Sequence, residues 1–210
     1  MAKSWKRIGA YLGILTGILW VVVTTIAMLT FPGGYLFFDY PISALGLTVI
    51  NSTPSMLNYF LFVSACTGAA VCLIPFVLTI RTLFTETMGL KALSGLGTMF
   101  CLIAAPFLSA LAVFAGNEYP SLHGWSTIYF FIFIMLGILF YSIGIFLNSE
   151  YKNLYGVIGF VIVIICILHI VGMFGIASMY FASPIWQKIA IYGLVLWSVF
   201  QGYYLLKVFD

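Results

Sequence analysis

Charged residues are scarce in this 210-residue sequence: it has eight Lys and Arg and five Asp and Glu, which together make up 6% of the chain. An ordinary soluble domain carries about 25% charged residues, whereas 64% of this chain is hydrophobic. A surface that faces water cannot be built from this composition, which excludes a soluble globular domain. The net charge of +3 is small, and because membrane topology accounts for it, no nucleic-acid partner is expected.

Several motifs of catalysis and metal binding are also missing. No His-Glu-x-x-His or Gly-x-Ser-x-Gly sequence occurs, so no zinc hydrolase or serine hydrolase is indicated by motif. The four cysteines lie inside long apolar stretches without Cys-x-x-Cys spacing, which argues against a disulfide framework: Cys66, Cys72, Cys101 and Cys166. No cofactor or metal ion is therefore predicted. With no internal repeat and no linker, residues 1–210 are expected to form a single domain.

Long apolar runs are the feature that the sequence does have. A hydrocarbon core of about 30 Å needs roughly 20 helical residues, and backbone polar groups within it must be satisfied by the helix itself. Six runs meet this length, at residues 8–30, 57–80, 92–115, 125–147, 154–181 and 185–209. The predicted fold class is therefore all-α, a polytopic bundle of six transmembrane helices.

The charges between these runs predict the orientation in the cell membrane. With the N-terminus in the cytoplasm, seven of the eight basic residues fall on the cytoplasmic side: Lys3, Lys6, Arg7, Arg81, Lys91, Lys152 and Lys207. Lys188 is then the one basic residue outside. This asymmetry follows the positive-inside rule, so both termini are expected to be cytoplasmic and the long loop between the first two helices to be outside.

Small residues mark helix packing. Gly9, Gly13 and Gly17 repeat every four residues and share one face of the first helix, where a neighbouring backbone could approach closely. This face is expected either to be buried in the bundle or to pair with a second protomer in a homo-oligomer. Gly156 with Gly159, and Gly172 with Gly175, mark the fifth helix in the same way.

Two outer segments carry the polar residues that could form a site. The first is the long connection around residues 31–56, which is rather apolar and is expected to fold back into the bundle. The second covers residues 116–126. Together these segments supply a carboxylate, a hydroxyl and an imidazole on one side of the membrane, from Asp39, Ser43, Glu118 and His123. These four residues are the candidate ligand-binding site, and we expect Asp39 or Glu118 to approach His123.

At these segments the chain resembles a known family. Pro41-Ile42-Ser43-Ala44-Leu45-Gly46, the following stretch through Asn51 and Pro54, and Glu118-Tyr119-Pro120-Ser121-Leu122-His123-Gly124 look like the two signatures of the domain-of-unknown-function 998 family. They are also similar to those of the eukaryotic family of damage-regulated autophagy modulators and a glycosylphosphatidylinositol-anchor remodelling factor. The resemblance implies six membrane helices and a link to lipid handling.

The resemblance implies importance for Ser43, Gly46 and His123 without a mechanism. Related sequences often have an acidic residue directly after the Ile-Ser pair, where this chain has Ala44. The carboxylate that relatives have at this position is therefore either missing from this chain or supplied from another position, for which Asp39 is the candidate.

Three roles remain open for His123: a structural hydrogen bond from the start of a helix to a loop carbonyl, contact with a polar headgroup or ligand, and acid–base catalysis. Catalysis would use Glu118 or Asp39 beside it, or Ser43 as a nucleophile with Asp39 as the orienting carboxylate. His169, the one ionisable residue deep inside a predicted span, is expected to face protein. A hydrogen bond to a Ser, Thr or Tyr on a neighbouring helix is favoured for it and a ligand contact is the alternative, so His169 is a fifth candidate ligand-binding residue.

Two functions from different classes follow. The first is a membrane protein that binds or handles lipid or a small apolar ligand from the outer face, with both outer segments covering a cavity between helices. The alternative is an intramembrane hydrolase or acyl transferase that acts on lipid, with His123 as acid, base or metal ligand. Membrane lipids are the expected partners in both.

Overall fold

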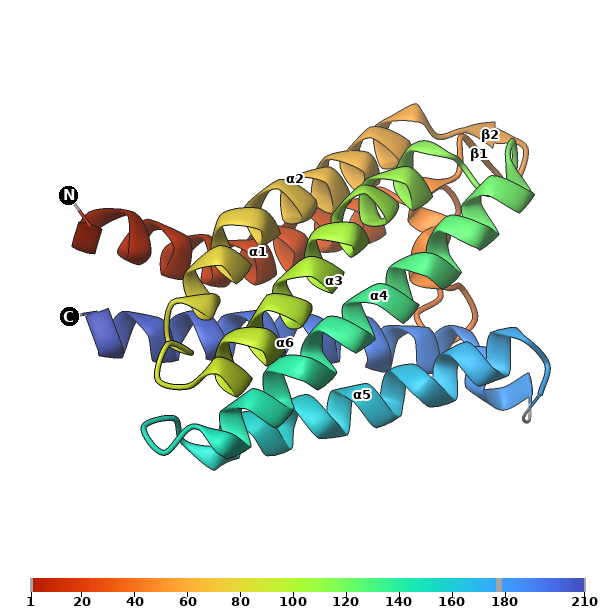
Figure 1. Cartoon of the computed structure of the whole chain (residues 1–210). Helices are drawn as coiled ribbons and strands as arrows, with labels where there is room; N and C mark the ends of the chain where they lie inside the picture. The colour runs from red at the N-terminus through yellow and green to blue at the C-terminus, as the bar shows by residue number, and fades with distance from the viewer. Residues whose placement is uncertain (1, 177–178, 210) are drawn as a thin grey trace.

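The computed structural model describes residues 2–176 and 179–209 and contains six long α-helices (Figure 1). All six are long and apolar enough to cross a membrane, as a multi-pass membrane protein requires. The all-α six-helix architecture predicted from the sequence is thus confirmed. The helices are α1 (Ala2–Leu29), α2 (Met56–Arg81), α3 (Met88–Val113), α4 (Pro120–Leu147), α5 (Asn153–Met173) and α6 (Pro184–Phe209).

The helices form a closed ring. Each helix packs on the next one in the sequence, and α6 returns to pack on α1, so the first and last helices close the ring. Both ends of the chain lie at the same end of the bundle (Figure 1), which we call the terminal end. The opposite end carries the connections α1–α2, α3–α4 and α5–α6, and we call it the loop end.

Glycines let α1 approach two partners at once. A Cβ added at Gly9 would lie 2.8 Å from the Pro75 carbonyl oxygen of α2, and one at Gly17 would lie 2.5 Å from a methyl carbon of Val199 on α6. Both distances are too short for a side chain to fit. The small-residue face of α1 is therefore packed within the chain, and pairing of two protomers through it would require α1 to leave this position.

Glycines also allow close approach between other neighbouring helices of the ring. Gly97 of α3 and Gly137 of α4 face each other, since a Cβ at either position would lie 3.1–3.2 Å from the carbonyl oxygen of the other. Gly159 of α5 lies against Ser142 of α4, where a Cβ would meet the hydroxyl oxygen at 2.0 Å. Close backbone approach thus recurs around the ring, as is typical of membrane helices.

The fifth helix is shorter than the apolar run that predicts it. It ends at Met173 because Gly175 adopts φ +67° and its N–H donates to the Gly172 carbonyl, while the Ile176 N–H donates to the Val171 carbonyl. These two bonds form a Schellman motif. The expected continuation to residue 181 was wrong, since Met179–Ala182 instead form a short 3₁₀ helix, η2, that packs on α5. Gly172 faces η2, where a Cβ would lie 2.7 Å from the Ala182 nitrogen.

The long α1–α2 connection, residues 30–55, folds back over the loop end of the ring, and we call it the cap. It contains a 3₁₀ helix, η1 (Ile42–Gly46), which contacts α1, α2, α3 and α6. A two-stranded antiparallel hairpin follows, with β1 (Val49–Ile50) and β2 (Thr53–Pro54). Asn51 and Ser52 both have positive φ at its turn, which suits the twist of a two-residue hairpin loop. The expectation that this apolar connection returns to the bundle is confirmed by the burial of most of η1.

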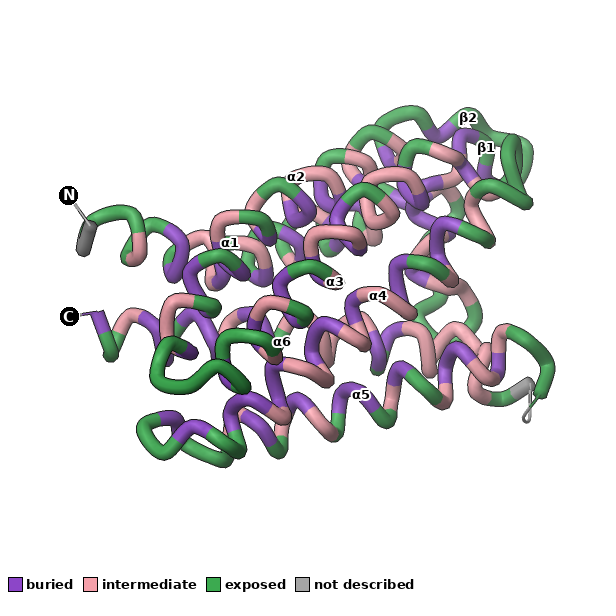
Figure 2. Tube along the Cα trace, viewed as in Figure 1, coloured by how far each residue is buried: buried purple, intermediate pink, exposed green. Residues whose placement is uncertain are grey.

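Apolar side chains occupy both the inside and the outside of the ring. Figure 2 shows buried residues on the faces that helices turn toward one another and exposed residues on their outer faces. Many of those exposed side chains are large and apolar, including Ile18 and Val22 of α1, Val71 of α2 and Ile164 of α5. Such a surface is suited to acyl chains and is unlike that of a soluble protein.

The packing of α1 on α2 can be tested with one pair of alanine substitutions. Gly9→Ala places a methyl group against the Pro75 carbonyl, and we expect it to destabilise the protein by about 1–3 kcal/mol. The matched control is Gly68→Ala on α2, because nothing lies within 4 Å of a Cβ at Gly68. Thermal unfolding in detergent should show a lower midpoint for Gly9→Ala and no loss for Gly68→Ala. Equal midpoints would contradict the close contact.

Candidate functional site

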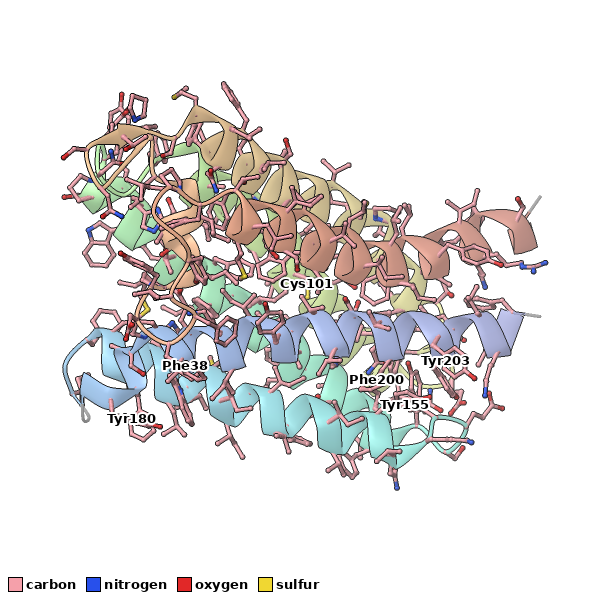
Figure 3. All side chains as sticks on the ribbon, turned by 180° about the vertical axis from the view of Figure 1, so that it is seen from behind. Phe38, Cys101, Tyr155, Tyr180, Phe200 and Tyr203 are labelled. Carbon is pink, nitrogen blue, oxygen red and sulfur yellow. The ribbon has the colours of Figure 1, made fainter. Side chains whose placement is uncertain are left out.

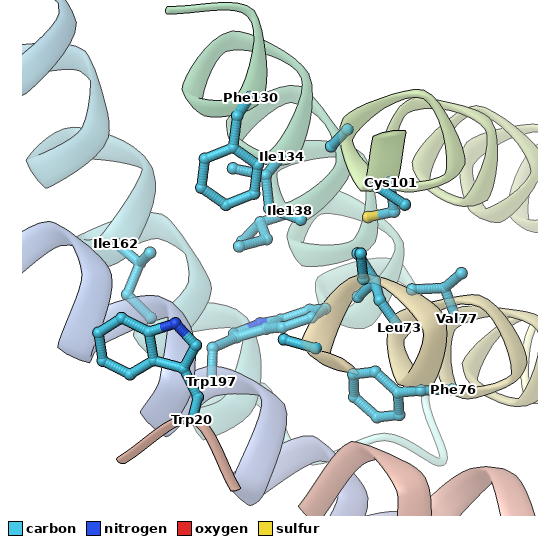
Figure 4. Close-up of a cluster of buried hydrophobic side chains, with 14 of the residues drawn as sticks. Trp20, Leu73, Phe76, Val77, Cys101, Phe130, Ile134, Ile138, Ile162 and Trp197 are labelled. Atoms are coloured by element: carbon cyan, nitrogen blue, oxygen red, sulfur yellow. The ribbon is translucent and has the colours of Figure 1, made fainter. Parts of the chain in front are cut away.

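A cavity of ≈ 90 Å³ lies inside the ring, toward the loop end. Its walls come from α1, α2, α3, α4 and α6, and η1 of the cap contributes Ile42 and Ser43. Figure 4 shows part of this wall, with Trp20 of α1, Phe130 and Ile134 of α4, and Trp197 of α6 around the central space. The volume is several times what one water molecule needs, so the cavity could hold part of a larger molecule.

The cavity wall consists mainly of apolar side chains. Most of its few hydroxyls are bonded to backbone carbonyls of their own helices and do not offer a free polar group to the cavity. Thr16 donates to the Leu12 carbonyl at 2.7 Å, Thr127 to the His123 carbonyl at 2.8 Å, and Ser198 to the Val195 carbonyl at 2.8 Å. None of the residues that line the cavity carries a charge. Pockets of this kind bind apolar molecules and use a few polar groups for orientation.

The cap is tied to the start of α6 at the loop end of the cavity. The Ile42 N–H donates to Gln187 Oε1 at 3.0 Å, and Gln187 itself lines the cavity. The neighbouring Lys188 donates from Nζ to the Tyr40 carbonyl. Because Ile42 and Ser43 form the adjoining wall, these bonds fix the part of the cap that closes the cavity.

Lys188 is a contact of the cap that was not predicted from the sequence. Only 1% of its surface is exposed, and its Nζ lies 5.3 Å from the ring centre of Tyr35 and 4.8 Å from that of Phe37. Asp39 of the cap interacts electrostatically with its ammonium group. Figure 3 shows Phe38, the next aromatic residue of the cap, beside the first turns of α6. One sequence feature could have indicated this contact. Lys188 is the one basic residue predicted on the same side of the membrane as the loop between the first two helices, and that loop is rich in aromatic residues.

The Tyr40 carbonyl is a second fixed point of the cap, since it accepts hydrogen bonds from both Lys188 and the Tyr35 hydroxyl, the latter at 2.9 Å. Burial raises the pKa of the Tyr35 phenol above its usual range, with a smaller contribution from Tyr192. The phenol therefore stays protonated and keeps donating at any physiological pH.

The α3–α4 connection holds the other side of the cap. The side chain of Asn117 accepts from the Thr48 N–H at 3.2 Å and donates to the Thr48 hydroxyl at 2.9 Å. That hydroxyl donates in turn to Glu118 Oε1 at 2.5 Å. The two polar segments of the loop end are thus in direct contact through Thr48, which was not among the predicted site residues.

His123 lies in the first turns of α4 and reaches back to the end of α3. Its Nδ1 is 2.7 Å from the Leu111 carbonyl oxygen and 3.1 Å from that of Phe114. Two carbonyl acceptors require Nδ1 to carry the proton, so the ring holds the end of α3 against the start of α4. This is the bonding expected of the structural role.

His169 is buried, with 1% of its surface exposed, so it faces protein. Its Nδ1 lies 2.9 Å from the Phe181 carbonyl oxygen in η2, so its partner is a backbone group and not the favoured Ser, Thr or Tyr. The ring also meets Phe131, a residue of the cavity wall, edge to face at 4.8 Å. Because α5 ends at Met173, His169 lies one turn from the end of the helix, so the expected position deep inside the span was wrong.

The four candidate residues make different contacts. Asp39 lies near Lys188, Ser43 lines the cavity, Glu118 binds Thr48, and His123 binds the end of α3. Within residues 2–176 and 179–209, no hydrogen bond joins any two of them, and no group of three His, Cys, Asp or Glu is placed to hold a metal ion. Ser43 is the candidate that the structure places on the cavity.

Comparison with family models, with curated proteins and with solved structures finds no match to this chain. The family resemblance stays a prediction.

The buried lysine can be tested by its effect on the cap. Lys188→Met keeps most of the side-chain length but removes the hydrogen bond to Tyr40, and charged hydrogen bonds are worth about 1.5–3 kcal/mol. We expect amide hydrogen exchange in residues 35–46 to accelerate by roughly tenfold or more. Lys207→Met, at an exposed position of the same helix, is the control and should leave the cap unchanged. Unchanged exchange in Lys188→Met would show that other contacts hold the cap.

Proposed function

We propose that this protein binds an apolar molecule, such as the acyl chain of a membrane lipid, in the cavity inside the ring. The cap covers the loop end of the cavity, so the ligand would be taken up and released on that side of the membrane. The uncharged, mainly apolar wall is the observation that carries the proposal. A bound hydrocarbon chain would lose no hydrogen bonds on leaving the bilayer for such a space.

The energetics of the cavity support occupancy. Unfilled apolar cavities cost roughly 24 cal/mol per Å³, so a space of ≈ 90 Å³ corresponds to about 2 kcal/mol. A ligand that fills the space recovers contacts of this magnitude. In a bundle whose helices otherwise approach to backbone contact at glycines, the retained volume points to a ligand.

The contacts of His123 favour binding over catalysis. Proton transfer to or from a substrate requires a ring nitrogen that can change its protonation state within reach of the substrate. Nδ1 of His123 is bonded to two backbone carbonyls, which leaves Nε2 as the nitrogen that could exchange a proton, but His123 is absent from the cavity wall, where the ligand would lie. We therefore assign His123 to positioning the α3–α4 connection, which carries the Asn117 and Glu118 contacts to the cap.

Filling the cavity tests the proposal directly. Ala69 lines the cavity, and Ala69→Leu would place a branched side chain in it; Ala92→Leu makes the same change at an exposed position of α3. Mass spectrometry of lipids that remain with the purified protein should find a bound species in the native protein and in Ala92→Leu. We expect its amount to fall at least fivefold in Ala69→Leu, as the lost volume removes about 1 kcal/mol or more of contact. Equal retention in all three proteins would refute binding in this cavity.

We further propose that the protein lies in the cell membrane with its terminal end in the cytoplasm. The supporting observation is the placement of charge: Lys6, Arg7, Arg81, Lys91, Lys152 and Lys207 belong to the terminal end, and Lys188 to the loop end. Positive residues are retained on the cytoplasmic side during insertion. The cap and the ligand would then face the outside.

This orientation predicts the labelling of two matched cysteine variants. Thr53 in the cap and Thr85 in the α2–α3 connection are both exposed, at opposite ends of the bundle. A membrane-impermeant maleimide should label Thr53→Cys in intact cells and label Thr85→Cys only after lysis. The native protein measures the background from its four cysteines, of which Cys66, Cys101 and Cys166 are buried. The reverse labelling pattern would invert the proposed topology.

A further inference from the structure

Three N–H donors of α6, on Trp186, Trp197 and Gln201, have no partner among the described residues, and the last two are the most deeply buried. Trp197 and Gln201 are four residues apart, which places them one above the other on the helix, and 2% and 1% of their surfaces are exposed. Among the described residues, neither Trp197 Nε1 nor Gln201 Nε2 has an acceptor. Trp197 lines the cavity at the end farther from η1, and Gln201 lies one turn closer to the terminal end.

These donors contrast with the polar groups around them. The Tyr141 hydroxyl donates to the Val77 carbonyl at 2.9 Å, and the Tyr151 hydroxyl donates to Gln201 Oε1 at 2.5 Å. The latter bond leaves the Gln201 N–H groups as donors. A buried donor without an acceptor costs about 1–3 kcal/mol, so this face of α6 is unsatisfied within the chain itself.

The chemistry of the two groups restricts what could satisfy them. An indole N–H only donates, and the free part of Gln201 is also a donor, so the complement is an acceptor. No lysine or arginine lines the cavity, which leaves the charge of a carboxylate or phosphate without a counter-ion there. A neutral carbonyl oxygen on an apolar body fits both conditions.

We propose that the deep end of the cavity recognises a neutral carbonyl group, as in a long-chain ketone or ester, through the indole N–H of Trp197. Gln201 lies outside the cavity wall, one turn closer to the terminal end. The hydrocarbon part of the ligand then lies along the apolar wall toward Ile42 and Ser43 of the cap. This inference rests on the proposed function, because it specifies the chemistry of a ligand in the same cavity.

The test compares two probes that differ in one carbonyl group, 2-tetradecanone and tetradecane. Purified protein in nanodiscs is exposed to an equal mixture and isolated, and the retained probes are counted by gas chromatography and mass spectrometry. We expect the ketone-to-alkane ratio to fall about tenfold in Trp197→Phe, which keeps an aromatic ring without the N–H. Trp125→Phe is the matched control: Trp125 is exposed and does not line the cavity, so its ratio should equal that of the native protein. Ratios between proteins cancel the partition of each probe into lipid.

A second measurement is independent of any substitution. The carbonyl stretch of ¹³C-labelled 2-tetradecanone bound to the native protein should lie at lower frequency than in hydrocarbon solvent, because a donor bonds to its oxygen. A ratio unchanged in Trp197→Phe with the stretch at its hydrocarbon frequency would overturn the carbonyl site, while retention of both probes would leave the cavity proposal standing. Retention no greater than in Ala69→Leu would overturn both.

Discussion

Helices in a lipid bilayer gain nothing from hiding apolar surface, so this bundle depends on how closely its helix backbones approach one another. Gly9 and Gly17 let α1 touch α2 and α6 at once, and Gly97 with Gly137 brings α3 onto α4. These contacts make a ring out of helices whose outer faces are as apolar as their inner ones. In the part of the interior that holds the cavity, side chains and not close backbone contacts set the distance between helices.

The cap extends this constraint to a segment without long helices. Its backbone must find partners at the membrane edge, and it does so at Gln187 and Lys188 on one side and at Asn117 on the other. The ammonium group of Lys188 lies over the rings of Tyr35 and Phe37 and donates to the Tyr40 carbonyl, so these groups take the place of water around it. The hydrogen bonds that hold the cap in place therefore also fix the loop end of the cavity wall.

The sequence could predict what depends on length and composition, and less of what depends on packing. Six apolar runs were enough for six helices, but hydropathy continues past residue 173, so the break at Gly175 was hidden in an apolar stretch. The two outer segments were expected together and do meet, yet through Thr48 and not through His123. The burial of Lys188 and the position of the cavity depend on how the cap folds, which no local pattern of residues encodes.

The closing contact of the ring joins the first helix to the last. All other neighbours in the ring follow one another along the chain, so five of these pairings can form as the helices enter the bilayer in turn. The pairing of α1 with α6 has to wait for the ribosome to release the final segment. Until then the cavity lacks the part of its wall that α6 supplies, including Gln187 and Trp197, and the cap lacks the hydrogen bond from Ile42 to Gln187. A nascent chain short of its last helix would therefore leave the cavity open to the bilayer and the Ile42 N–H without its acceptor.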